Sequence, residues 1–302
     1  MAPDQGAGHP RPDGKAEEER VVELRATTTT PPGGMRGPAS RAAINQGSPR
    51  LGRELPRRYT AADLGVLTDD EVSRFVRGGD GDPRADITLA WELLYRLEPG
   101  LYDRLVSAER LHPGVLGWLP RHVDRIVEVG AGAGRLTLEL IGRGREVVAI
   151  EPAMPLRQIL ARKLGEADHG GRARVIPGFF DALPVASGSA DLVVACSAFT
   201  PAPGHGGEAG LSEMERVCRP GGRVAIIWPN HLGWLAAHGY TYVRFAGPMA
   251  AEFTSAGEAA ELAGIFYPRA AAEVRRLGQR RVPFEVLGIN PPRDLAFKMV
   301  GP

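Results

Sequence analysis

Residues 126–137 of this 302-residue chain read IVEVGAGAGRLT. An apolar, β-branched run leads into three glycines at alternate positions, Gly130, Gly132 and Gly134, and a helical pattern follows them. Glycines let a backbone turn sharply and approach a ligand closely, and the first turn of a helix offers unpaired N–H groups. The stretch therefore predicts a strand, a ligand-binding loop and a helix in succession.

Two glutamates give the loop chemical specificity that a glycine pattern alone would lack in a chain with 39 glycines. Glu128 stands two residues before Gly130, where a carboxylate would repel a pyrophosphate but could hold an ammonium group or orient the loop through its N–H groups. Glu151 closes the next apolar run, where doubly wound folds place an acid for ribose hydroxyls. The spacing also differs from the Gly-x-Gly-x-x-Gly of dinucleotide-binding loops. These features favour a nucleoside with a cationic, amino-acid-like tail.

Short apolar runs alternate with helical segments beyond this loop. The runs are residues 125–129, 146–150, 173–176, 191–196 and 223–228. The intervening helical segments are residues 136–143, 154–164 and 208–219. Such alternation predicts a parallel, doubly wound α/β sheet with helices on both faces.

The C-terminal part predicts a different connection. After a helix over residues 257–277, two strands over residues 282–287 and 294–300 are separated only by a short turn. A parallel pair needs a crossover of about a dozen residues or more, so these strands must be antiparallel. We therefore expect the sheet to end in a C-terminal antiparallel hairpin.

The chain divides into three predicted regions. Residues 1–55 are rich in Pro, Gly, Thr and charge, and we expect this N-terminal extension to be disordered. Residues 56–120 carry helical patterns that predict a lid over the carboxyl edge of the sheet or a buttress for it. Residues 121–302 form the predicted α/β domain.

Five segments together resemble a known family over residues 121–300. They read EVGAGAGRLT, AIEP, LPVASGSADLVVACSAF, EMERVCRPGGRVAIIWPN and PFEVLGINPPRDLAFKMV. In this order they resemble the class I S-adenosylmethionine-dependent methyltransferases. The resemblance implies S-adenosylmethionine as cofactor, and a Rossmann-like, doubly wound, seven-stranded sheet that ends in the hairpin.

The resemblance also implies cofactor-binding residues. The first motif would surround the methionine part of the cofactor, through Glu128, Gly130, Ala131, Gly132 and Gly134. Glu151 would bind the ribose hydroxyls, with Pro152 beside it.

The adenine end departs from the family pattern. Phe179 stands where the family often has an acid, and Asp181 is the candidate for that contact, with a solvated turn as the alternative. Phe179 or Phe180 could pack on the adenine face or in the core. Cys196 ends the fourth run, where open α/β sheets place ligands, although free cysteines are usually small buried residues.

The acceptor side carries weaker signals. His205 and His231 are candidate general bases if the acceptor loses a proton, with surface positions as the alternative. Aromatic residues after the fifth run could wall an acceptor pocket or belong to the core: Trp228, Trp234, Tyr240 and Tyr242. Tyr95 and Tyr102 in the predicted lid could touch the ligand. The acceptor, expected to be a small molecule, and the oligomeric state stay open.

Composition sets bounds on the class of protein. The 37 Lys and Arg residues against 36 Asp and Glu argue against a surface built for nucleic acid or anionic lipid. Two cysteines without partners at metal-ligand spacing predict neither a disulfide framework nor a metal site. The sequence lacks an apolar run of about 18 residues, and we expect a cytoplasmic protein without membrane or nucleic-acid partners. A nicotinamide oxidoreductase and a non-catalytic methyltransferase-like module are the competing interpretations.

Overall fold

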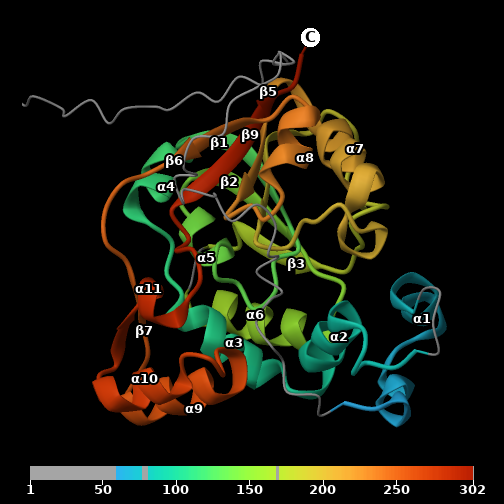
Figure 1. The fold of residues 1–302 in the computed structure, drawn as a ribbon. Helices are drawn as coiled ribbons and strands as arrows, with labels where there is room; N and C mark the ends of the chain where they lie inside the picture. The colour runs from blue at the N-terminus through green and yellow to red at the C-terminus, as the bar shows by residue number, and fades with distance from the viewer. Residues whose placement is uncertain (1–58, 77–80, 168–169, 302) are drawn as a thin grey trace, which may run out of the picture.

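A twisted sheet forms the centre of the computed structural model, which describes residues 59–76, 81–167 and 170–301 (Figure 1). The seven strands lie in the order β3-β2-β1-β4-β5-β9-β6. Their bounds are β1 (Val123–Val129), β2 (Gly144–Ile150), β3 (Ala173–Ile176), β4 (Ala190–Cys196), β5 (Cys218–Ile227), β6 (Thr241–Arg244) and β9 (Asp294–Met299). β1 to β5 run parallel, and β9 runs antiparallel between β5 and β6. The predicted doubly wound, seven-stranded α/β sheet is confirmed.

Helices cover both faces because successive strand residues point to opposite sides. Val127 and Val193 belong to an apolar cluster with α7 (Gly207–Val217) and α8 (Leu232–Ala237). Ile126, next to Val127 in β1, belongs to the cluster on the other face. That face is covered by α4 (Pro113–Trp118) and α5 (Thr137–Leu140), while α6 (Met154–Glu166) contacts β3. Burial of both sheet faces explains the continuous apolar runs of the sequence.

The strand register brings the functional segments to one edge of the sheet. Val129 of β1 pairs with Ile150 of β2, so Gly130 and Glu151 follow their strands at the same level. Cys196 of β4 likewise pairs with Ile227 of β5. The carboxyl ends of the parallel strands, where such sheets bind ligands, therefore meet at this edge.

The predicted C-terminal hairpin needs a correction. Of residues 282–287, only the beginning lies in a strand, β8 (Arg281–Pro283), which pairs with β7 (Ala250–Glu252) in a separate small sheet. Residues 284–287 form the short helix α11 (Phe284–Leu287), whose buried apolar side chains resemble a strand in sequence. β9 is antiparallel as predicted, but its neighbours are β5 and β6.

A helical cap covers the carboxyl edge of the sheet. It contains η2 (Ala61–Val66), α1 (Asp69–Phe75), α2 (Ile87–Leu97) and α3 (Pro99–Ala108) from the N-terminal side. The predicted helix over residues 257–277 is two helices, α9 (Ala256–Phe266) and α10 (Ala271–Leu277), which lie beside α3 in Figure 1. Trp91 of α2 stacks on Phe266 of α9 with ring centroids 5.9 Å apart. Segments before β1 and after β7 therefore build the cap together.

Two further predictions concern the N-terminal extension and membrane-spanning segments. The disordered extension predicted for residues 1–55 lies outside the described residues. Among the helices of the described part, each is too short or too polar to cross a membrane.

Candidate functional site

The glycine loop turns from β1 into α5 with its three glycines in the left-handed region. Their φ angles are +70° for Gly130, +56° for Gly132 and +94° for Gly134. The Gly130 N–H donates to the Ile150 carbonyl at 2.9 Å, which holds the loop against the end of β2. A Cβ on Gly134 would lie 2.6 Å from the Leu160 side chain. Backbone conformation and packing on α6 thus both require glycine at this position.

Glu151 lies at the end of β2 with its carboxylate in the floor of the site. Its Oε2 accepts the N–H of Gly132 at 2.8 Å and its Oε1 accepts the N–H of Ala153 at 2.8 Å. Burial raises the pKa of Glu151 to about 7, and these two N–H donors oppose the rise. Because each carboxylate oxygen has two lone pairs, both oxygens can accept a further hydrogen bond from ligand hydroxyls.

Glu128 lies at the end of β1, where its side chain is bound to the first residue of α5. Its side chain is buried in β1, and its Oε2 accepts the Thr137 hydroxyl of α5 at 2.6 Å. Burial raises the pKa of Glu128 to about 8, against the lowering effects of Thr137 and of the Arg135 charge. The carboxyl group is therefore mostly neutral at pH 7. Its hydrogen bond ties β1 to the start of α5 and so orients the loop between them.

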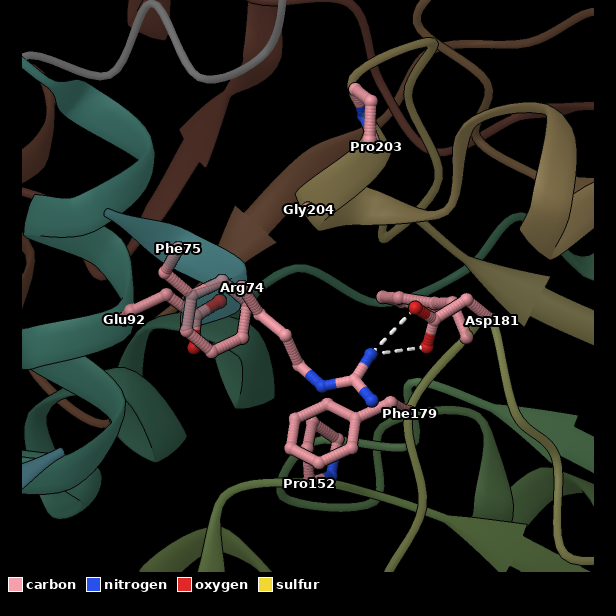
Figure 2. Close-up of a pocket in the computed structure, with 9 residues that line it drawn as sticks. Arg74, Phe75, Glu92, Pro152, Phe179, Asp181, Pro203 and Gly204 are labelled. Atoms are coloured by element: carbon pink, nitrogen blue, oxygen red, sulfur yellow. Dashed lines mark hydrogen bonds and ion pairs between the residues drawn. The ribbon is translucent and has the colours of Figure 1, made fainter. Parts of the chain in front are cut away.

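A pocket opens at Pro152, the residue after Glu151, between the sheet and α1 (Figure 2). Phe179 and Asp181, from the segment after β3, form one wall with Pro152, and Arg74 of α1 lies against them. The remaining lining residues are Phe75, Glu92, Phe180, Pro203 and Gly204. An aromatic face next to a carboxylate suits a planar ring that carries an amino group.

Phe180 and Ala131 help to shape the loop. The Phe180 ring packs on Phe199 at 4.9 Å between centroids, and a Cβ on Gly130 would lie 3.1 Å from the Phe180 ring. The Ala131 N–H donates to the same Ile150 carbonyl as Gly130, at 3.0 Å. Phe180 therefore packs against the loop at Gly130, and the Ala131 N–H helps to hold the loop at the end of β2.

Glu92, which lines the other side of this pocket, belongs to a group of buried charged residues. Arg96 of α2 donates to Glu71 of α1 at 2.6 Å and to Glu92 at 2.7 Å. The Nε2 of His205 lies 3.3 Å from Glu92 Oε1, and His205 is buried. Although burial raises the pKa of Glu71, the hydrogen bond from Arg96 and the N–H of Thr68 bring it below its ordinary value. The candidate base His205 thus lies between the pocket and the cap, not on the surface.

A second buried cluster lies at the ends of β4 and β5. Arg135 of the glycine loop donates to Glu109 at 3.2 Å and to the Sγ of Cys196 at 3.4 Å. Its guanidinium lies 5.0 Å from the Trp228 ring centroid, and the Tyr267 hydroxyl donates to Glu109. Cys196 is therefore a buried neighbour of Arg135.

The other aromatic residues predicted to wall an acceptor pocket lie in separate places. Trp234 donates to Glu208 at 2.8 Å on α7, and Tyr242 donates to Asp294 at 2.9 Å on β9. Tyr240 lies in the core cluster under α7 and α8. His231 precedes α8, and burial lowers the pKa of its imidazole. Trp228, from the predicted acceptor wall, stacks with the guanidinium of Arg135 beside the glycine loop.

The cap tyrosines lie over the glycine loop. A Cβ on Gly132 would lie 3.3 Å from the Tyr102 ring, and Tyr102 packs edge-on against Tyr95 at 4.7 Å between centroids. The cap residues that complete the site, Arg74, Glu92 and Arg96, carried no recognisable signal in the sequence. They look like ordinary charged positions of helices, and Arg74 is 107 residues from Asp181, its partner in the pocket.

Comparison with known proteins agrees with this arrangement. Residues 126–222 match the family model of a methyltransferase domain. These residues, which make up the centre of the sheet, are thus similar to a methyltransferase domain. An uncharacterized methyltransferase of Mycobacterium tuberculosis is 30% identical over 157 residues, which cover 50% of this chain and 59% of that protein. The chain thus matches about three fifths of that relative.

Two further similarities are more distant. The biotin biosynthesis bifunctional protein BioHC of Cellvibrio japonicus is 28% identical over 180 residues, which cover 54% of this chain and 32% of that protein. The crystal structure of the YcgJ protein of Bacillus subtilis is 16% identical, with a TM-score of 0.41, and the match covers 63% of this chain and 100% of that chain.

The residues present fit S-adenosylmethionine, the cofactor of the methyltransferase family. Gly130 and Gly132, with positive φ angles, leave the loop backbone without Cβ atoms where Tyr102 approaches it, 3.3 Å from the position of a Cβ on Gly132; the loop and Tyr102 form the candidate cradle. Glu151 at one side of this cradle offers carboxylate lone pairs, and the pocket of Phe179 and Asp181 continues from Pro152. Oxygen acceptors, backbone N–H groups and an aromatic face are the partners that an aminoacyl nucleoside needs.

Proposed function

We propose that this protein transfers the methyl group of S-adenosylmethionine to a small-molecule acceptor. The observation that carries the proposal is the position of the Glu151 carboxylate, which joins the glycine loop through Gly132 and adjoins the Phe179 pocket through Pro152. In this arrangement Glu151 binds the ribose hydroxyls, and Asp181 and Phe179 hold the adenine ring. The glycine loop faces the methionine part.

The cofactor supplies an activated methyl group on a sulfonium, so the protein's contribution is position and exclusion of water. Tyr102 and Tyr95 cover the loop from the cap, and Trp228 with Arg135 closes the acceptor side. Glu128 keeps the loop in place through Thr137. His205 is held by Glu92, and we propose it, with His231, only for an acceptor that must lose a proton.

The cap of helices over the strand ends favours a small acceptor. The cap helices α2, α3 and α9 pack on one another above the strand ends, with Trp91 stacked on Phe266. A folded polymer would have to displace this layer, and the net charge of +1 offers little attraction to nucleic acid.

Calorimetric titration with S-adenosylhomocysteine tests the cofactor site. We expect the wild-type protein to bind it and Glu151→Gln to bind roughly tenfold or more weakly, because a hydrogen bond to a charged group is lost. Glu166→Gln is the matched control, since Glu166 is exposed on α6, and its affinity should equal that of the wild type. Equal affinity of folded Glu151→Gln and wild type would contradict the proposed role of Glu151.

Turnover separates an enzyme from a non-catalytic module. A labelled methyl donor should transfer label to a member of a small-molecule panel and not to RNA or protein. Binding of S-adenosylhomocysteine with no transfer to any acceptor, together with capture of a protein partner, would favour the non-catalytic interpretation.

A further inference from the structure

Arg74 lies at the end of the pocket where the adenine ring is proposed to bind, next to Phe179 and Asp181. Its Nη1 donates to Oδ1 and Oδ2 of Asp181 at 2.5 and 2.6 Å, and its Cζ lies 4.2 Å from the Phe179 ring centroid. Figure 2 shows the guanidinium between the Phe179 ring and the Asp181 carboxylate. Asp70 holds its Nε from the same helix at 3.0 Å.

A guanidinium and an aminopurine have in common the chemical features that this pocket can bind. Both are planar, both stack on an aromatic face, and both donate N–H groups to a carboxylate. Arg74 uses the same ring face of Phe179 and the same carboxylate of Asp181. The two therefore compete for one place.

The Arg74 side chain can leave Asp181 without a movement of the whole helix, because α1 has a second attachment. Glu71, in the first turn of α1, is held by Arg96 in a pair of nearly buried side chains. The Arg74–Asp181 pair is more exposed, with 24% and 35% of the side-chain surfaces accessible. Partly exposed ion pairs are weak, so Arg74 can leave while the helix stays anchored.

We propose that Arg74 is an autoinhibitory latch, which occupies the adenine end of the cofactor pocket and is displaced when the cofactor binds. The inference rests on the proposed function, because the displacing ligand is the adenine of S-adenosylmethionine. Closure of the latch lowers the fraction of binding-competent molecules and so weakens the apparent affinity.

Titration of S-adenosylhomocysteine into Arg74→Gln tests the latch. The variant should bind roughly two- to tenfold more tightly than the wild type, the range for loss of a partly exposed ion pair with a stacked guanidinium. Added salt should tighten binding to the wild type and leave the variant unchanged, since salt screens the pair. The matched control is Arg276→Gln, because Arg276 forms an exposed pair with Glu273 on α10. It should bind as the wild type does.

Two further variants keep the test decisive. In an Asp181→Asn background, Arg74→Gln should give a smaller gain, because the ion pair is already lost and only the stacking on Phe179 remains. Asp70→Asn removes one support of Arg74 at an exposed position and should tighten binding by a smaller factor than Arg74→Gln.

The two proposals fail differently. If the wild type binds S-adenosylhomocysteine and Arg74→Gln binds it equally or more weakly, the latch is wrong and the cofactor site stands. If neither the wild type nor any latch variant binds it, both proposals are wrong.

Discussion

Glu128 and Glu151 are two buried acids whose ionisation opposes folding. Burial raises their pKa values from the ordinary 4.5 to about 8 and about 7. Between pH 4.5 and these values the folded chain holds a proton that the unfolded chain has released. Stability should therefore be fully present below pH 4.5 and fall as the pH rises through this window, by up to about 1.4 kcal/mol per pH unit for each group.

Denaturant unfolding of Glu128→Gln as a function of pH checks this expectation. A neutral amide cannot ionise, so the variant should show a shallower fall in the free energy of unfolding between pH 5 and pH 8. Glu166→Gln, on the exposed face of α6, should keep the wild-type slope. A slope unchanged in Glu128→Gln would show that Glu128 ionises normally in the folded protein.

The glycine loop and α6 form the element on which the site is built. Gly134 has φ +94° and faces Leu160 of α6, so Gly134→Ala should lower the free energy of unfolding by about 1–3 kcal/mol. A Cβ on Gly165, in the same helix, would meet no atom of the described residues within 4 Å. There Gly165→Ala should instead stabilise by about 0.5–1 kcal/mol. Denaturant unfolding of both variants measures the difference, and equal effects would contradict the packing described for the loop.

The strands of the domain were predictable because both sheet faces are buried. β1, β2 and β4 each end in four consecutive buried residues, nearly all of them apolar, and the connecting helices have their own period. The segment 282–287 was misassigned because a short apolar run has the same appearance in a strand and in a buried helical turn. Gly288, at φ +73°, ends α11 in the left-handed conformation and marks the helix that the pattern missed.

The cofactor side of the site was predictable to the extent that it is local in sequence. Glu151 and the glycine loop follow neighbouring strands, so their meeting follows from the topology. The cap contribution could not be predicted in this way, because Arg74 and Arg96 come from helices far away in the chain. The hydrogen bond from the Thr137 hydroxyl to Glu128 likewise could not be predicted from the spacing of the motif.

At the scale of the whole molecule, the cap joins the helices before β1 to the helices after β7. The hydroxyl of Tyr267, directly after α9, donates to the buried Glu109 after α3, which also pairs with Arg135 of the loop. Removing this hydroxyl leaves a buried carboxylate with one partner fewer, so Tyr267→Phe should lower the free energy of unfolding by about 1–3 kcal/mol.

Tyr240→Phe is the matched control for that prediction. Tyr240 is equally buried, but its hydroxyl reaches Glu215 only at 3.4 Å, so its removal should change the free energy of unfolding by less than about 1 kcal/mol. Thermal or denaturant unfolding gives both values. Similar losses in the two variants would mean that the Tyr267 contact does not link the cap to the glycine loop.

A crystal structure of the protein with S-adenosylhomocysteine tests most directly whether the cap and the sheet together hold this nucleoside. We predict the ribose hydroxyls within ~3 Å of the Glu151 carboxylate, the adenine ring on Phe179 and the Arg74 guanidinium displaced from Asp181. A complex in which the nucleoside lies elsewhere, without contact to Glu151 or the glycine loop, would contradict the methyltransferase site described above.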